Sequence, residues 1–248
     1  MKEVLKDRTR YLNNLIFLLA MVNRMQNAKP DNYAFLLSGL LLLFLFIPIL
    51  HSFPGLAEDS FVMRVGLPAG YSGLMLLGVW SLQEENRLFR LGMALAVLSV
   101  VFSVSAIIYS NLVFRLCLNL TVLSFSAISA VIVVRHVFGG ATVDRNLLFG
   151  AMCVYLLIGL IWAILYGLIV QFWPGSFNGL ANPGGTVTMD NLLYYSFVTL
   201  AGLGYGDITP LAPLARTLAY MEVIAGQLYI AIMLAGLVGI FLNERSSR

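Results

Sequence analysis

Long apolar runs, separated by short polar connections, dominate the pattern of this chain. A helix needs roughly 20 apolar residues to cross about 30 Å of hydrocarbon. The pattern predicts six transmembrane helices, at residues 33–50, 61–82, 91–109, 116–138, 147–172 and 214–242. Pro68 lies inside the second of them and predicts a kink there.

The first 30 residues follow a different pattern. They begin polar and basic and turn apolar only from Leu15 to Val22, a run too short to span a membrane. We expect residues 1–30 to form a cytoplasmic segment whose amphipathic helix lies on the membrane surface. The alternative is a segment that packs beneath the other helices.

Composition also indicates a membrane protein. Of its 248 residues, 60% are hydrophobic and 11% are charged, and the mean hydropathy is +0.88. This excludes an ordinary soluble domain and predicts an all-α polytopic membrane protein. The two cysteines and two histidines are isolated, and no nucleophile–base pair or large basic surface is present. We therefore expect no enzyme activity, no cofactor and no nucleic-acid partner.

The basic residues predict the orientation. All but three of the 15 Lys and Arg residues fall on the cytoplasmic side if the N-terminus is inside, the exceptions being Arg64, Arg115 and Arg216. Cytoplasmic loops carry the excess of Lys and Arg. We expect a multi-pass protein of the cell (inner) membrane, surrounded by membrane lipids, with both termini in the cytoplasm.

One stretch between the last two apolar runs carries the candidate chemistry. Residues 191–210 read NLLYYSFVTLAGLGYGDITP, which predicts a short helix over 191–200 followed by a glycine-rich loop. Glycine at alternate positions permits dihedral angles that aim successive carbonyl oxygens at one axis. Rings of such oxygens can replace the water shell of K⁺, and the helix would point its negative C-terminal end toward the ion.

The order of these features resembles the pore loop of the tetrameric potassium channel family. An aromatic pair, a Ser-Phe-Val-Thr run, GYGD and a following apolar helix stand in the family's order, and the resemblance covers the chain from about Asn146. It is similar to short bacterial members. Because the chain has a single such motif, a central pore would need four copies in a homotetramer.

The resemblance implies a role for each residue of the loop. K⁺ would bind the backbone carbonyls of four filter residues, which are Gly202, Leu203, Gly204 and Tyr205. Gly206 and Asp207 would complete the filter at its outer mouth. Tyr194 and Tyr195 would support the filter, Tyr194 near Asp207 and Tyr195 at the hydroxyl of Tyr205.

The loop also departs from the family. The usual pattern is Thr-Thr-Val-Gly-Tyr-Gly-Asp, and Gly202 replaces the threonine whose hydroxyl and carbonyl would form the innermost ion site. We expect potassium preference to survive with a weaker inner site. One alternative is a non-selective Na⁺/K⁺ channel, and another is a non-conducting regulatory or sensing subunit.

The last apolar run predicts the gate. Gly226 matches the family's hinge glycine, and the residues that follow it at helical spacing would line the cavity and close it as an apolar constriction. These are Gln227, Ile230, Ala231, Leu234 and Val238. The alternative is that this stripe packs against neighbouring helices.

Glu222 is an acidic residue well inside this run. A buried carboxylate is costly and usually has a partner or a function. We expect it to face the pore helix, bonding Thr199 or a filter amide and coupling the hinge to the filter. The alternative is a protonated or hydrogen-bonded structural residue.

These features divide the chain. Residues 31–138 form a four-helix peripheral bundle, 139–146 a linker and 147–248 a two-helix pore module. The fourth run has Arg115 and Arg135 only at its ends, so it lacks the arginine ladder of a voltage sensor. The bundle is therefore interpreted as a scaffold or as a receptor for a lipid or ligand.

Residues 173–189 read as an external turret that only connects, with Asp190 capping the pore helix.

Overall fold

A computed structural model describes residues 33–51, 86–109, 112–139, 145–181 and 187–246. Three predictions lie outside these residues. They concern the N-terminal segment 1–30, the second apolar run with Pro68, and most of the linker 139–146.

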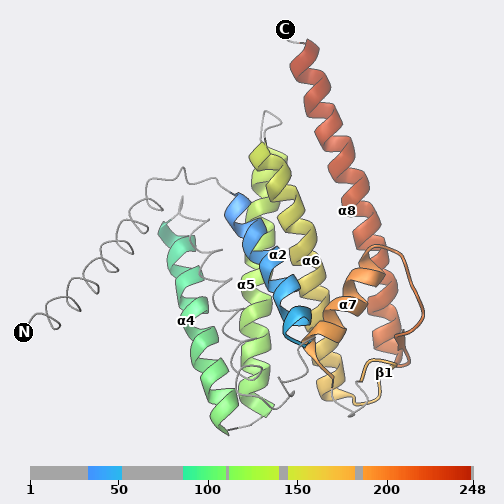
Figure 1. Cartoon of the computed structure of the whole chain (residues 1–248). Helices are drawn as coiled ribbons and strands as arrows, with labels where there is room; N and C mark the ends of the chain where they lie inside the picture. Colours follow the sequence, from blue (N-terminus) through green and yellow to red (C-terminus); the bar gives the residue numbers. More distant parts are fainter. Residues whose placement is uncertain (1–32, 52–85, 110–111, 140–144, 182–186, 247–248) are drawn as a thin grey trace, which may run out of the picture.

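Helices make up nearly all of the described chain. They are α2 (Tyr33–His51), α4 (Asn86–Tyr109), α5 (Leu112–Gly139), α6 (Arg145–Phe172), α7 (Met189–Leu200) and α8 (Pro213–Ser246). Apart from the short α7, they run side by side, with α4 at one edge and α8 at the other (Figure 1). Each predicted run on described residues corresponds to one of these helices.

Several helices are long and apolar enough to cross a membrane. Among the described residues they are Leu112–Arg135, Arg145–Phe172 and Pro213–Gly239. The predicted spans at 33–50 and 91–109 are represented by shorter apolar helices, Tyr33–Leu45 and Arg90–Ala106. The chain is therefore a multi-pass membrane protein.

The centre of the fold is α6, which packs against α2, α5, α7 and α8. Half of its apolar segment is buried, and Leu157, Leu160 and Tyr166 are fully enclosed. The Tyr33 N–H donates to Asn146 Oδ1 at 2.8 Å, which ties the start of α2 to the start of α6. The helix is apolar all round because it faces neighbours on several sides.

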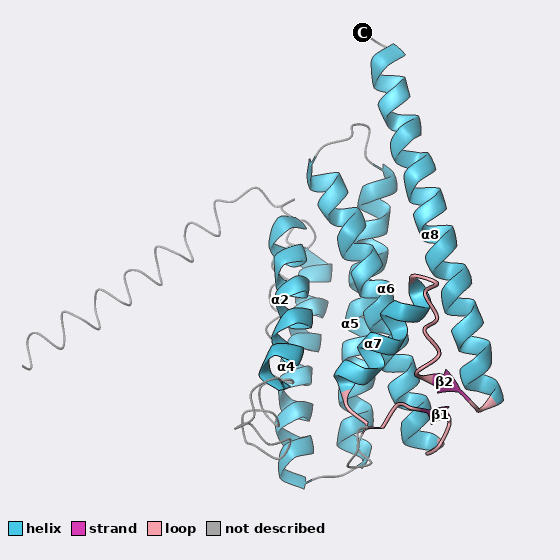
Figure 2. Ribbon diagram, turned by 45° about the vertical axis from the view of Figure 1, so that its right-hand side comes forward, coloured by secondary structure: helices cyan, strands magenta, loops and turns pink. Residues whose placement is uncertain are grey.

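A short antiparallel pair of strands is added to the otherwise helical fold. Strands β1 (Phe177–Asn178) and β2 (Thr209–Pro210) pair with Phe177 opposite Pro210 (Figure 2). The carbonyl of Ser176 also accepts the N–H groups of Leu211 and Ala212, at 2.8 and 3.1 Å. The expectation that the turret only connects is therefore wrong, because it holds the chain that follows the glycine-rich loop.

Candidate functional site

The short helix α7 positions the glycine-rich loop. It lies between α6 and α8 (Figure 1) and buries one face, including Leu193, Ser196 and Leu200. Its N-cap residue is Thr188, without a side-chain cap hydrogen bond, so the expectation that Asp190 caps it is wrong. Asp190 lies in the first turn instead, where its charge still complements the helix dipole.

A Schellman motif ends α7. The Leu203 N–H donates to the Val198 carbonyl and the Gly202 N–H to the Thr199 carbonyl, both at 2.9 Å. Gly202 is the residue that turns left-handed, with φ +73°. Glycine stands here because this turn needs a positive φ, which a threonine would adopt only under strain. The sequence signal was available, since glycine directly after a helix commonly marks its end.

Left-handed glycines then alternate along the loop. The φ values are +73° at Gly202, +55° at Gly204 and +80° at Gly206. The intervening Leu203 and Tyr205 are 57% and 66% exposed within a single chain. This is the alternation that the spacing of the glycines predicted. The binding of K⁺ by these carbonyls stays a prediction.

At the outer end of the loop, Tyr194 meets Asp207 as expected. The Tyr194 hydroxyl donates to Asp207 Oδ2 at 2.6 Å. This hydrogen bond lowers the pKa of the Asp207 carboxyl and raises the pKa of the Tyr194 hydroxyl. Asp207 is thereby held in its charged form beside the mouth of the loop. The turret lies against the backbone of Asp207, since Gly179 is so near the Asp207 carbonyl that a Cβ would not fit.

Tyr195 packs against α6 and the turret. Its ring lies edge-to-face against Tyr166 and Phe177, with centroids 5.0 and 5.3 Å apart, and it shares a hydrogen bond with Thr199. The expected contact of Tyr195 with the hydroxyl of Tyr205 stays a prediction. Strand pairing places Phe177 beside Tyr195, a contact that depends on the turret and has no local sequence signal.

Glu222 is fully buried where three helices meet. The Tyr166 hydroxyl donates to its Oε2 at 2.5 Å, and its Oε1 lies 2.5 Å from the Ser196 hydroxyl oxygen. Ser196 Oγ also lies 2.8 Å from the Gly159 carbonyl oxygen. Glu222 therefore faces the pore helix as expected, but its partner there is Ser196, which corrects the expectation of Thr199 or a filter amide.

The number of protons defines the state of this cluster. Tyr166 and Ser196 carry one hydroxyl proton each for three oxygen–oxygen contacts, so with an ionised Glu222 the single proton of Ser196 is divided between Glu222 Oε1 and the Gly159 carbonyl. With a protonated Glu222, Oε1 donates to Ser196, Ser196 donates fully to Gly159, and all three hydrogen bonds are complete. A neutral acid also avoids the cost of burying an unpaired charge. The geometry thus favours the alternative of a protonated structural residue.

Gly226 lies one turn after Glu222 and is buried against the end of α7. A Cβ at this position would collide with the Leu200 carbonyl oxygen and side chain. Glycine therefore permits close approach of α8 to α7. The role of Gly226 as a hinge stays a prediction, as does the coupling of that hinge to the filter through Glu222.

The predicted cavity-lining stripe follows along α8. All five of its members are exposed within one chain: Gln227, Ile230, Ala231, Leu234 and Val238. Leu228 and Ile232, which lie off the stripe, are equally exposed, so the gate stays a prediction. Gln227 approaches the loop, with its Nε2 3.2 Å from the point that a Cβ on Gly202 would occupy.

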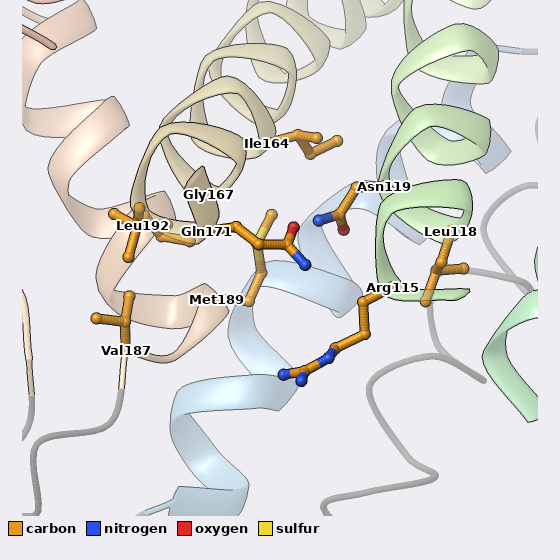
Figure 3. Close-up of a pocket in the computed structure, with 10 residues that line it drawn as sticks. Arg115, Leu118, Asn119, Ile164, Gly167, Gln171, Val187, Met189 and Leu192 are labelled. Carbon is orange, nitrogen blue, oxygen red and sulfur yellow. The ribbon is translucent and has the colours of Figure 1, made fainter. Parts of the chain in front are cut away.

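The peripheral bundle contributes to a pocket of about 420 Å³ beside the pore helix. Arg115 and Asn119 reach it from α5, Gln171 from α6 and Leu192 from α7 (Figure 3). Gln171 Oε1 is buried, and within the described part of the chain it has no hydrogen-bond partner. The pocket is the place to seek the predicted receptor role of the bundle.

Comparisons with known proteins match the second half of the chain. A family model described as an ion channel matches residues 151–243, which include α7, the loop and most of α8. The two pore potassium channel c of Oryza sativa subsp. japonica is 39% identical over 70 residues. These residues make up 28% of this chain and only 15% of the relative. No solved structure matches.

Proposed function

We propose that this chain, whose residues 151–243 match a family model described as an ion channel, is a subunit of a potassium-selective channel. K⁺ crosses passively, without enzymatic chemistry, through a filter made by the carbonyls of Gly202, Leu203, Gly204 and Tyr205. No arginine ladder gates it.

One observation carries this proposal. The loop after α7 has left-handed glycines at alternate positions, at Gly202, Gly204 and Gly206. That backbone can present successive carbonyls along one axis, which is the requirement for replacing the hydration shell of an ion. The bracing of the outer mouth by Tyr194 and the turret supports the same function, because a filter must hold its geometry while ions pass.

A homotetramer is proposed from the surface of α8. Only 11% of its apolar segment is buried within one chain, against 50% for α6. Large apolar side chains such as Tyr220, Ile224 and Leu234 are exposed on it. Four copies around an axis would cover this surface and leave the outer helices to membrane lipids. We place the channel in the cell membrane with both termini in the cytoplasm.

A specific observation favours a second function. Gly202 has no side chain, so the inner end of the filter lacks the four hydroxyls that the family pattern implies. Fewer oxygen ligands would weaken discrimination between K⁺ and Na⁺, which gives a non-selective cation channel. A non-conducting sensing subunit is the third alternative.

Ion flux into liposomes tests these alternatives. Purified protein is reconstituted with either K⁺ or Na⁺ as the sole permeant cation, and Gly204→Ala serves as the control with a strained filter. A large K⁺ flux with little Na⁺ flux is expected, and the control should lose it. Equal fluxes would favour the non-selective channel. If a cross-linked tetramer passes neither ion, the non-conducting subunit is the better account.

A further inference from the structure

The side chain of Gln227 ends beside Gly202. If a Cβ is placed on Gly202, the neighbour within 4 Å outside the adjoining residues is Gln227 Nε2, at 3.2 Å. A threonine hydroxyl would lie one bond length from that Cβ. The Gln227 amide therefore lies next to the region where the missing oxygen would be.

The amide can present an oxygen there. A glutamine side chain ends in one carbonyl oxygen and one NH₂ group of nearly equal shape, and which of them faces a neighbour is set by its partners. Within the part of the chain that the structure describes, the Gln227 amide has no hydrogen bond that fixes its orientation. A cation at the inner end of the loop would turn the oxygen toward itself.

The backbone of Gln227 is held in position by its neighbours on α8. Gly226, directly before it, lies against the Leu200 carbonyl, and Glu222 is hydrogen-bonded to Ser196 one turn earlier. Both contacts join α8 to α7, whose Schellman turn places Gly202. The separation of Gln227 from Gly202 is thus determined by two contacts, so a ligand role does not depend on a freely moving helix.

We propose that Gln227 is a specificity-determining residue, whose amide oxygen completes the innermost cation site that Gly202 leaves open. The ligand is a partly dehydrated monovalent cation, K⁺ in preference to Na⁺. In a tetramer four such oxygens replace the four absent hydroxyls. This inference rests on the proposed function, and it explains how potassium preference survives the loss of threonine.

Two variants of nearly the same size test the role. Gln227→Met keeps the length of the side chain and removes the oxygen, whereas Gln227→Glu keeps an oxygen at the same place. Leu228→Met, on an exposed neighbouring position of α8, controls for the added methionine. K⁺ binding is measured by titration calorimetry of the purified full chain, and the K⁺/Na⁺ permeability ratio by reversal potential in bilayers.

We expect Gln227→Met to lower K⁺ affinity and the permeability ratio by at least roughly two- to tenfold, the effect of losing even one of the four polar contacts. Gln227→Glu should bind K⁺ at least as tightly as the wild type, and Leu228→Met should match it. If Gln227→Met binds and selects K⁺ as the wild type does, the proposal is overturned while the channel remains. If the wild type neither binds nor conducts K⁺, the proposed function fails as well.

Discussion

Gly202→Ala is the substitution whose effect the structure defines most closely. An alanine here must adopt φ +73°, which costs about 1–2 kcal/mol for an L-residue. Its Cβ would also lie 3.2 Å from the Gln227 amide, so that side chain must shift slightly. Because this strain lies within one folded chain, it lowers the stability of the chain against unfolding. We expect a clear loss of that stability, together with altered selectivity.

Gly175→Ala is the matched control. Gly175 has a similar φ, +82°, but no atom lies within 4 Å of its added Cβ, and it belongs to the turret rather than the loop. It should carry the same backbone strain of about 1–2 kcal/mol and leave ion selectivity unchanged. The difference between the two variants in stability and in ion selectivity isolates the effect of placing a methyl group beside Gln227.

The assay is equilibrium unfolding of the purified protein in detergent, with reversal potentials measured on the same preparations. A strain of about 1–2 kcal/mol for one chain changes an equilibrium constant roughly five- to thirtyfold. If Gly202→Ala is as stable and as selective as the wild type, Gly202 is not left-handed in the working channel. The Schellman turn and the argument built on it would then be refuted. Gly202→Thr carries the same strain, so it cannot by itself report on the missing hydroxyl.

Three further substitutions test other contacts. Tyr194→Phe removes the donor that lowers the pKa of the Asp207 carboxyl, so that carboxyl should become protonated at a higher pH than in the wild type. The stabilisation of the charged carboxylate is lost as pH falls through this pKa, and acid should therefore reduce the current at a higher external pH. Asp207→Asn should abolish this pH dependence. Gly226→Ala should destabilise the folded chain by about 1–3 kcal/mol in a thermal unfolding assay, because its Cβ collides with Leu200 of α7. Gly239→Ala in the same helix, with open space around it, should gain about 0.5–1 kcal/mol, and equal effects would contradict the close approach. Glu222→Gln keeps a donor and an acceptor and should fold normally, while Glu222→Leu should lower the free energy of unfolding by about 1–3 kcal/mol. The infrared band of a protonated carboxyl should be present in the wild type and absent from Glu222→Gln. A wild type without this band would disprove the neutral acid.

The parts of the site that depend on local backbone chemistry could be predicted from the sequence. Alternate glycines require positive φ wherever carbonyls line up, so the conformations of Gly204 and Gly206 follow from their spacing alone. The helix at 191–200 followed from the same stretch. Gly202 was interpreted through the threonine it replaces, although its place directly after a helix already indicated a left-handed cap.

The remaining contacts could not be predicted because they join residues far apart in the chain. The pairing of Phe177 with Pro210 depends on how the turret folds back, and it is accompanied by the ring contact between Phe177 and Tyr195. The partners of Glu222 come from α6 and α7, so sequence reasoning identified a buried acid that needs partners without identifying them. Gln227 was expected to line the cavity, and only its distance from Gly202 indicates a closer role.

The most direct test of potassium selectivity is a reversal potential, measured on purified protein in a planar bilayer with K⁺ on one side and Na⁺ on the other. We predict a value near the potassium equilibrium potential. A value near zero with substantial current would contradict potassium selectivity and would show that the loop around Gly202 admits both ions.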